Sequence, residues 1–140
     1  MTANEIMSAL ALKLGELFPD RAVHYTQIPR DADGNHYVRC IGQSHTKKLG
    51  RRRERVYSFE VLYFCKEGDA LAFNDWAEAL YSELETLTVG GQLVHITGAH
   101  AEPGDDMVFH FVFDITVSGL IDPPAGEPME GLETTEVLKE

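Results

Sequence analysis

The chain has 140 residues, of which 44% are hydrophobic, so it is long enough for one domain with a substantial core. Its 12 basic and 23 acidic residues give a formal net charge of −11, which excludes the extended basic surface that general nucleic-acid binding requires. No apolar run approaches the length of a membrane span, and the N-terminus lacks a signal-peptide pattern. We therefore expect a soluble cytosolic protein with no membrane partner.

A helix is predicted over residues 3–18. Its apolar residues recur at the spacing of one helical face, and they are Ile6, Leu10, Leu14 and Leu17. Thr2, with Glu5 three residues later, predicts a capping box at the start of the helix. Pro19 predicts the end, because a residue that precedes proline is disfavoured in the helical region.

Three strands are predicted next, over residues 22–28, 36–45 and 55–66. The third strand is rich in aromatic and β-branched residues, which favour sheets. Its more uniformly apolar face, which we expect in the core, consists of Tyr57, Phe59, Val61, Tyr63 and Cys65. The second and third strands are expected to form a hairpin with Gly50 in its turn.

A second helix is predicted over residues 70–87, ended by Gly90-Gly91. Its apolar stripe consists of Phe73, Trp76, Ala77, Leu80, Leu84 and Leu87. The opposite face is mostly acidic and consists of Asp75, Glu78, Ser82 and Glu85. A solvated surface is the simplest interpretation of such a face, and a docking surface is the alternative.

Two further strands are predicted over residues 92–102 and 107–119, the second with strict alternation of buried and wet positions. Residues 120–140 contain three Pro, two Gly, six acidic residues and one Lys, and are expected to form an extended or disordered tail. The sequence thus predicts a folded domain over residues 1–119 and an acidic tail over 120–140.

The predicted order is helix, three strands, helix, two strands. Short connections suit hairpins, so we predict an α+β fold: a mainly antiparallel sheet of about five strands, with both helices packed on one face.

No motif for phosphate, dinucleotide or metal binding, or for nucleophilic catalysis, is present. The six histidines have no metal-like spacing and are expected to face solvent or to have a hydrogen-bond partner. Cys40 and Cys65 form no CxxC motif and are expected to be buried free thiols. We therefore expect no enzymatic activity, no cofactor and no metal, although an enzyme of unrecognised type stays a third alternative.

A basic block precedes the third strand and is opposed only by Glu54. It consists of Lys47, Lys48, Arg51, Arg52, Arg53 and Arg55. A solvated loop would hold these like charges at a cost, because they repel one another. A nucleic-acid contact lacks interleaved aromatic residues. A docking loop needs an acidic partner surface, and this protein carries one itself on its second helix, at Asp75, Glu78 and Glu85. Arginine suits bidentate contact with carboxylates.

Several stretches resemble one family in their order and spacing. They are a leading helix that ends in "LFPD", the strand "LGRRRERVYSFEVLYF", the helix "WAEALYSELE", a "GG" turn before "LVHITG", and the strand "VFHFVFDITV". Over about residues 5–119 the chain resembles the phage tail terminator, or tail completion, family of prophages and phage-tail-like particles of Gram-positive bacteria.

The resemblance implies a structural protein that forms a ring, typically a hexamer, which caps the finished tail tube and presents a surface to the neck or head connector. DNA would pass through the lumen without sequence readout. Assembly would take place in the host cytoplasm, and the protein would end in the virion tail. The basic block would then reach a sister subunit, or else the tail tube or sheath. The alternative function is a small nucleic-acid-binding module that uses residues 47–55.

Overall fold

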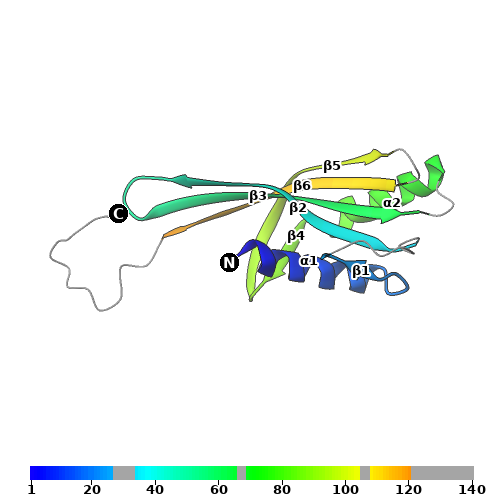
Figure 1. Cartoon of the computed structure of the whole chain (residues 1–140), viewed down its shortest axis with the longest axis horizontal. Helices are drawn as coiled ribbons and strands as arrows, with labels where there is room; N and C mark the ends of the chain where they lie inside the picture. The colour runs from blue at the N-terminus through cyan, green and yellow to red at the C-terminus, as the bar shows by residue number, and fades with distance from the viewer. Residues whose placement is uncertain (27–33, 66–68, 105–107, 121–140) are drawn as a thin grey trace.

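The computed structural model describes residues 1–26, 34–65, 69–104 and 108–120. Within these ranges the chain forms two helices and six strands (Figure 1). They are α1 (Ala3–Leu17), β1 (Val23–His24), β2 (His36–Lys47), β3 (Arg52–Phe64), α2 (Ala70–Glu83), β4 (Thr86–Val89), β5 (Gln92–Pro103) and β6 (Val108–Leu120). The α+β class is confirmed, with six strands in the sheet where about five were predicted.

The strands lie in the order β1-β2-β3-β6-β5-β4. Every pair is antiparallel except β1 with β2, where two residues of β1 pair in parallel. The strand predicted over 22–28 is therefore much shorter within the described residues, which stop at residue 26 and resume at 34. The predicted tail lies outside the described residues from 121 onward.

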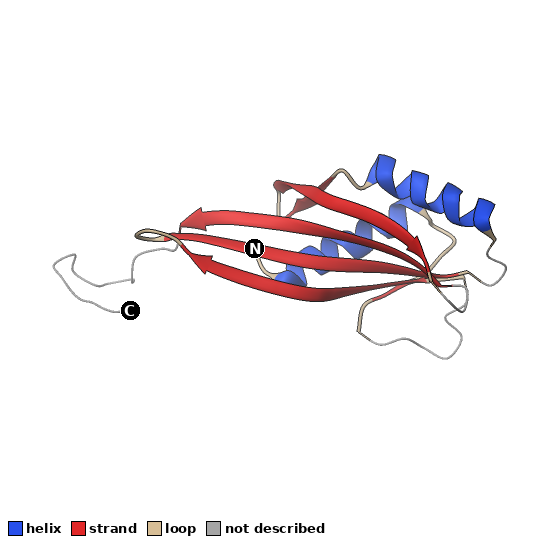
Figure 2. Cartoon of the chain, turned by 90° about the horizontal axis from the view of Figure 1, so that it is seen from above, coloured by secondary structure: helices blue, strands red, loops and turns tan. Residues whose placement is uncertain are grey.

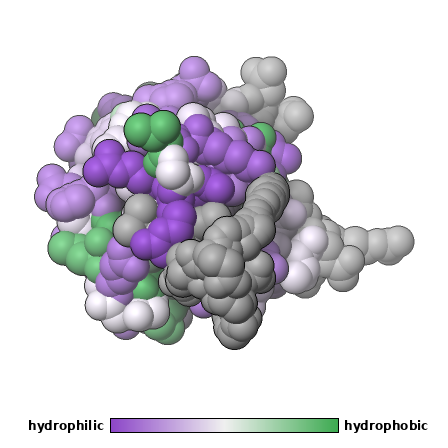
Figure 3. Space-filling model, turned by 90° about the vertical axis from the view of Figure 1, so that its left-hand side faces the viewer, coloured by the Kyte–Doolittle hydropathy of each residue, from purple (hydrophilic) through white to green (hydrophobic). Residues whose placement is uncertain are grey.

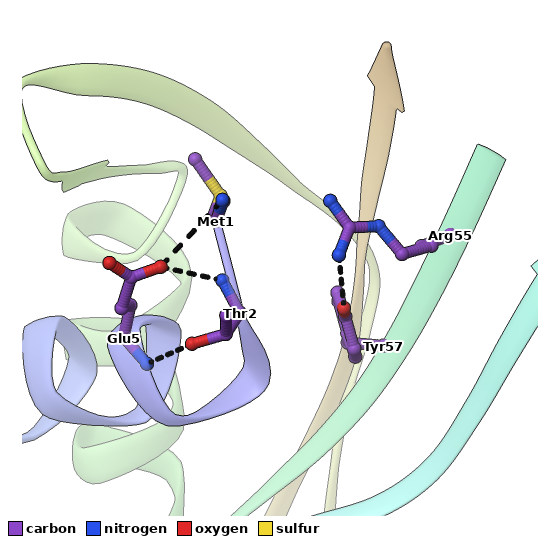
Figure 4. Close-up of polar contacts among 5 residues, drawn as sticks. All are labelled: Met1, Thr2, Glu5, Arg55 and Tyr57. Atoms are coloured by element: carbon purple, nitrogen blue, oxygen red, sulfur yellow. Dashed lines mark hydrogen bonds and ion pairs between the residues drawn. The ribbon is translucent and has the colours of Figure 1, made fainter. Parts of the chain in front are cut away.

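The start of α1 follows its predicted capping box. Glu5 N donates to Thr2 Oγ1 at 3.2 Å, and Thr2 N donates to the Glu5 carboxylate at 2.7 Å (Figure 4). Together they satisfy backbone donors that the first turn of a helix leaves without partners. The helix ends at Leu17, just before Pro19, with Phe18 as its C-cap.

The second helix is shorter than predicted. Its C-cap is Leu84, and the following residues form β4, which pairs with β5. Gly90 and Gly91 do not end the helix: both have positive φ (58° and 82°), which suits the tight turn of the β4–β5 hairpin. The position of Leu87 fits the apolar spacing of a helix and also that of a strand. Its pairing with β5 places it in a strand.

The core lies between the two helices and one face of the sheet. Ile6, Leu10 and Leu14 of α1 are fully buried, as predicted, and Trp76 of α2 is 4% exposed. The predicted inner face of β3 is confirmed at Phe59, and the alternation of β6 is confirmed by its buried members, Phe109, Phe111, Phe113 and Ile115. Burial of these large side chains drives the two layers together.

One histidine belongs to this core. His36 Nε2 accepts a hydrogen bond from Trp76 Nε1 at 3.1 Å, and its ring stacks against Tyr63 at a centroid distance of 5.0 Å. Burial first, and the nearby Arg21 charge second, lower the pKa of His36 from 6.5 to about 3. His36 is thus a neutral structural residue, in line with the expectation that the strand histidines have hydrogen-bond partners.

Acid should destabilise the fold through His36. The unfolded chain binds a proton below pH 6.5 and the folded chain only near pH 3, so stability is full above pH 6.5 and falls as the pH drops between those values. The loss is about 1.4 kcal/mol per pH unit, or ~2 kcal/mol at pH 5. Urea denaturation at pH 7 and pH 5 measures it, and His36→Gln should lose this component.

His95→Gln is the matched control, because His95 is exposed on β5. It should retain the pH dependence of the wild type. An unchanged slope in His36→Gln would contradict the assignment of the acid sensitivity to His36.

Candidate functional site: a basic three-stranded arm

The basic block lies on an arm that projects beyond the helices. Three long strands run past the helical layer toward the turn between β2 and β3 (Figures 1 and 2). The strands extend further than predicted, so only residues 48–51 connect them, and Gly50 has the positive φ (70°) that its place in the turn requires. The end of β6 pairs with β3 as far as Arg52 and Leu120.

Strand geometry divides the basic side chains of the block between the two faces of the arm. Lys47, Arg52, Arg53 and Arg55 lie on strands, where successive side chains point to opposite faces. Arg53 and Arg55 share the face of β3 that carries Tyr57, while Arg52 points to the other face. The sequence did not reveal this arrangement, because lysine is depleted in strands and the pairing of β3 with both β2 and β6 overrides local preference.

Arg53, Arg55 and Lys48 have partners on the arm, and Arg51 is also engaged in an interaction. Arg53 Nη1 donates to the carbonyl oxygens of Gly50 and Arg52 at 3.0 and 2.7 Å, which stabilises the turn. Arg55 Nη1 donates to the Tyr57 hydroxyl at 3.2 Å (Figure 4). Lys48 Nζ lies 3.8 Å from a carboxylate oxygen of Glu54, and Lys48 is half-exposed, so this ion pair is weak.

Uncompensated positive charge is left at the end of the arm. Within the described ranges no hydrogen bond or ion pair engages the side chain of Lys47 or Arg52. Lys47 also lies directly opposite Arg53 across the β2–β3 ladder, and like charges at such positions destabilise a sheet. Hydrophilic side chains gather over this end of the molecule (Figure 3), and Leu49 in the turn is 93% exposed.

The predicted acidic residues lie on and after the second helix, and all are exposed. Asp75 and Glu78 share a face of α2, which lies at the end of the molecule opposite to the hairpin turn (Figure 1). Glu85 does not extend this helical face, since α2 ends at Glu83 and Glu85 lies in the connection to β4. Within one chain, the structure thus keeps the basic and acidic groups apart.

A polar cluster that the sequence did not reveal lies on the sheet face opposite to the helices. The Arg39 guanidinium contacts Oε1 of Glu60 at 2.6 Å, and His110 Nδ1 lies 2.8 Å from Oε2. The Glu60 side chain is only 10% exposed, so these partners are what makes its burial tolerable. The sequence offers one signal for this cluster, which is the acidic residue Glu60 in the middle of an apolar strand. It does not reveal the strand register that brings Arg39 and His110 beside Glu60.

Sites of other kinds find little support among the described residues. No group of three His, Cys, Asp or Glu side chains there is arranged to hold a metal ion. Cys40 and Cys65 are free and half-buried against the core, which is less burial than predicted. Neither helix is long and apolar enough to cross a bilayer.

Comparison with known proteins agrees with the resemblance. No curated protein matches the chain. The sequence matches the family described as "Phage tail terminator protein" over residues 5–127, which takes in all but the first two residues of α1, the whole of α2, the six strands and the basic arm. A match over this much of the chain shows the family: the chain belongs to the phage tail terminator proteins, components of the phage tail.

Proposed function

We propose that this protein forms a ring, a hexamer as in the family it resembles, that caps the completed tail tube and joins it to the neck while DNA passes through the lumen. The observation that carries the proposal is the segregation of charge. An arm with a net positive charge lies at one end of an elongated molecule, and the exposed acidic residues of α2 lie toward the other end (Figure 1).

This polarity favours contacts between unlike surfaces of neighbouring copies. Two arms repel each other, because each carries the same basic block, so a symmetric arm-to-arm dimer is disfavoured. An arm placed on the acidic surface of the next copy makes a heterologous contact instead, and such contacts close into a ring when the rotation between copies permits it. We assign Lys47, Lys48, Arg51, Arg52, Arg53 and Arg55 to one side of this contact and Asp75, Glu78 and Glu85 to the other.

The arm has a second candidate target in the tail tube or sheath. The guanidinium groups of the arm would bind carboxylates on the tube or sheath in the same way as carboxylates on a sister subunit. The two targets therefore involve the same interaction with a different protein. The sister subunit is favoured because its acidic residues are present in the chain itself.

The overall acidity suits the lumen of such a ring. A net charge of −11 repels DNA in transit, so the wall would not retain it. No enzymatic step and no cofactor is part of this function. Assembly takes place in the host cytoplasm, and the ring joins the tube to the neck of the virion.

Charge reversal on the arm tests the subunit contact. Arg51→Glu/Arg52→Glu/Arg53→Glu replaces attraction with repulsion at the end of the arm. Three exposed pairs at ~1 kcal/mol each correspond to a roughly 100-fold weaker self-association. Sedimentation velocity at about 0.05 and 0.5 M NaCl measures it, and wild-type assemblies should weaken with salt because exposed charges are screened.

A compensating variant separates a specific contact from general loss of solubility. Asp75→Arg/Glu78→Arg, combined with the triple reversal, should restore assembly, whereas Asp20→Arg/Glu16→Arg on and after α1 should not. Assemblies of the triple variant that are as stable as those of the wild type at both salt concentrations would rule out the inter-subunit contact. If the triple variant still assembles but no longer binds tail tubes in a pull-down, the tube is the target.

DNA binding discriminates the nucleic-acid alternative. A terminator should not retain duplex or single-stranded DNA at about 0.15 M NaCl in a filter-binding assay. A module that contacts phosphates with the six basic residues would bind DNA with a steep dependence of log affinity on log salt, of slope up to about −5 for duplex. Such a slope, lost in the triple reversal, would favour the alternative.

A further inference from the structure

The basic arm and the acidic surface of α2 each carry a leucine that the fold of its own chain leaves in water. Among the described residues, Leu49 (93% exposed) and Leu71 (73% exposed) are the most exposed large hydrophobic side chains. Leu49 lies in the turn at the end of the arm, and Leu71 lies in the first turn of α2. A single exposed leucine is ordinary, but here the two most exposed ones coincide with the two surfaces of opposite charge.

Local chemistry does not account for either leucine. Hairpin turns favour Gly, Asn, Asp, Ser and Pro, each for a conformational reason that leucine does not share. The first turn of a helix favours an acidic residue because of the helix dipole, and in α2 this turn has none. The hydrophobic core of the described residues includes neither Leu49 nor Leu71. A residue that departs from a local preference without a gain inside its own chain indicates a contact with another molecule.

On α2 the leucine continues into the acidic surface. Leu71, Asp75 and Glu78 are all exposed, and their spacing of four and three residues places them on one side of the helix. With a rise of ~1.5 Å per residue, this stripe is about 10 Å long. It presents an apolar side chain at one end and two carboxylates along the rest.

On the arm the leucine lies beside a cation. Arg52 N donates to the Leu49 carbonyl oxygen at 3.4 Å, so both residues belong to the same tight turn. The bonds of Arg53 Nη1 to the carbonyl oxygens of Gly50 and Arg52 stabilise that turn. The Arg52 side chain has no hydrogen bond or ion pair in the described part of the chain. The turn thus presents an apolar side chain and a cation together, which complements the stripe on α2.

We propose that Leu49 of one copy packs against Leu71 of the next copy, while cations of the arm pair with Asp75 and Glu78 beside it. This inference rests on the proposed function and adds an apolar centre to the charged contact between subunits. An apolar centre with a charged rim is the usual anatomy of a specific interface. Salt screens the rim but not the burial of the leucines, so part of the association persists at high ionic strength.

Serine variants test the leucine contact. Leu49→Ser and Leu71→Ser should each weaken self-association about tenfold, because a leucine is no longer buried on binding. Leu49→Ser/Leu71→Ser should lose little more than either single variant, since one substitution already removes the pair. Sedimentation velocity at about 0.05 and 0.5 M NaCl measures the losses, which should be equal at the two concentrations, unlike the losses caused by charge reversal.

Leu12→Ser is the matched control. Leu12 is 67% exposed on α1, with Glu16 one turn further along the same helix, so it is also a leucine beside a carboxylate. This variant should associate like the wild type, because the proposed contact does not involve α1.

Photo-cross-linking shows which surfaces meet. Replacement of Leu49 by the photoreactive p-benzoylphenylalanine should give cross-links to α2 around Leu71. The turn and α2 lie at opposite ends of one chain (Figure 1), so these cross-links should join two chains. A mixture of unlabelled and ¹⁵N-labelled protein, analysed by peptide mass spectrometry, verifies this. The same replacement at Leu12 should give no cross-links to α2 of another chain.

The outcomes separate this contact from the charged contact. If both serine variants associate like the wild type while charge reversal on the arm still weakens association, the leucine contact is wrong and the charged contact stands. Additive losses in the double variant, or cross-links only to surfaces other than α2, would also overturn the leucine contact. If neither serine substitution nor charge reversal changes association, both contacts are wrong. A wild-type protein that stays monomeric and gives no cross-links between chains overturns the leucine contact and leaves the tail tube as the target of the arm.

Discussion

The unbroken pairing of β3 with β6 is the constraint on which the rest of the structure depends. The two strands pair from Arg52 with Leu120 to Phe64 with Val108 without a shift in register. One half of this ladder lies under the helices and carries the aromatic core, and the other half forms the middle of the arm. Close-packed protein interiors deform little, so the packing around Phe59 and Phe113 also fixes the direction in which the charged turn between β2 and β3 points.

The strands on either side of this ladder, β2 and β5, each contain an irregularity near the point where the ladder leaves the core. β2 shifts register between Cys40 and Gly42, and β5 shifts between Thr97 and His100. Both register shifts lie next to one pair of residues in the central ladder, Ser58 and Asp114, where the Ser58 hydroxyl donates a hydrogen bond to the Asp114 carboxylate. Bulges bend a strand and increase its twist. Beyond this pair of residues β5 pairs with β6 only as far as Ile96, whereas β2 continues beside β3 into the arm as far as Lys47. The cluster of Arg39, Glu60 and His110 then fixes the three central strands to one another on the face without helices.

The sequence predicted the parts of this structure that local chemistry determines. The capping box of Thr2 and Glu5 and the apolar faces of β3 and β6 depend on neighbours a few positions away, and all of them are confirmed. Leu87 fits two periodicities, and only pairing with β5 shows that the helix stops before it. The extension of β3 into the basic block was not predicted for the same reason, since its partners there in β6 lie more than 60 positions away.

The position of the basic block on an arm also changes what its charge can do. On a loose loop, like charges would spread apart at little cost in structure, and the block would attract any anion that came near. On paired strands Lys47 and Arg53 are held opposite each other, so the arm carries strain that a carboxylate relieves. In the proposed assembly a neighbouring subunit supplies such a carboxylate. A tail tube that holds several copies side by side would raise the effective concentration of neighbours and so favour this contact. Ring closure would then be favoured at the end of the tail over free solution.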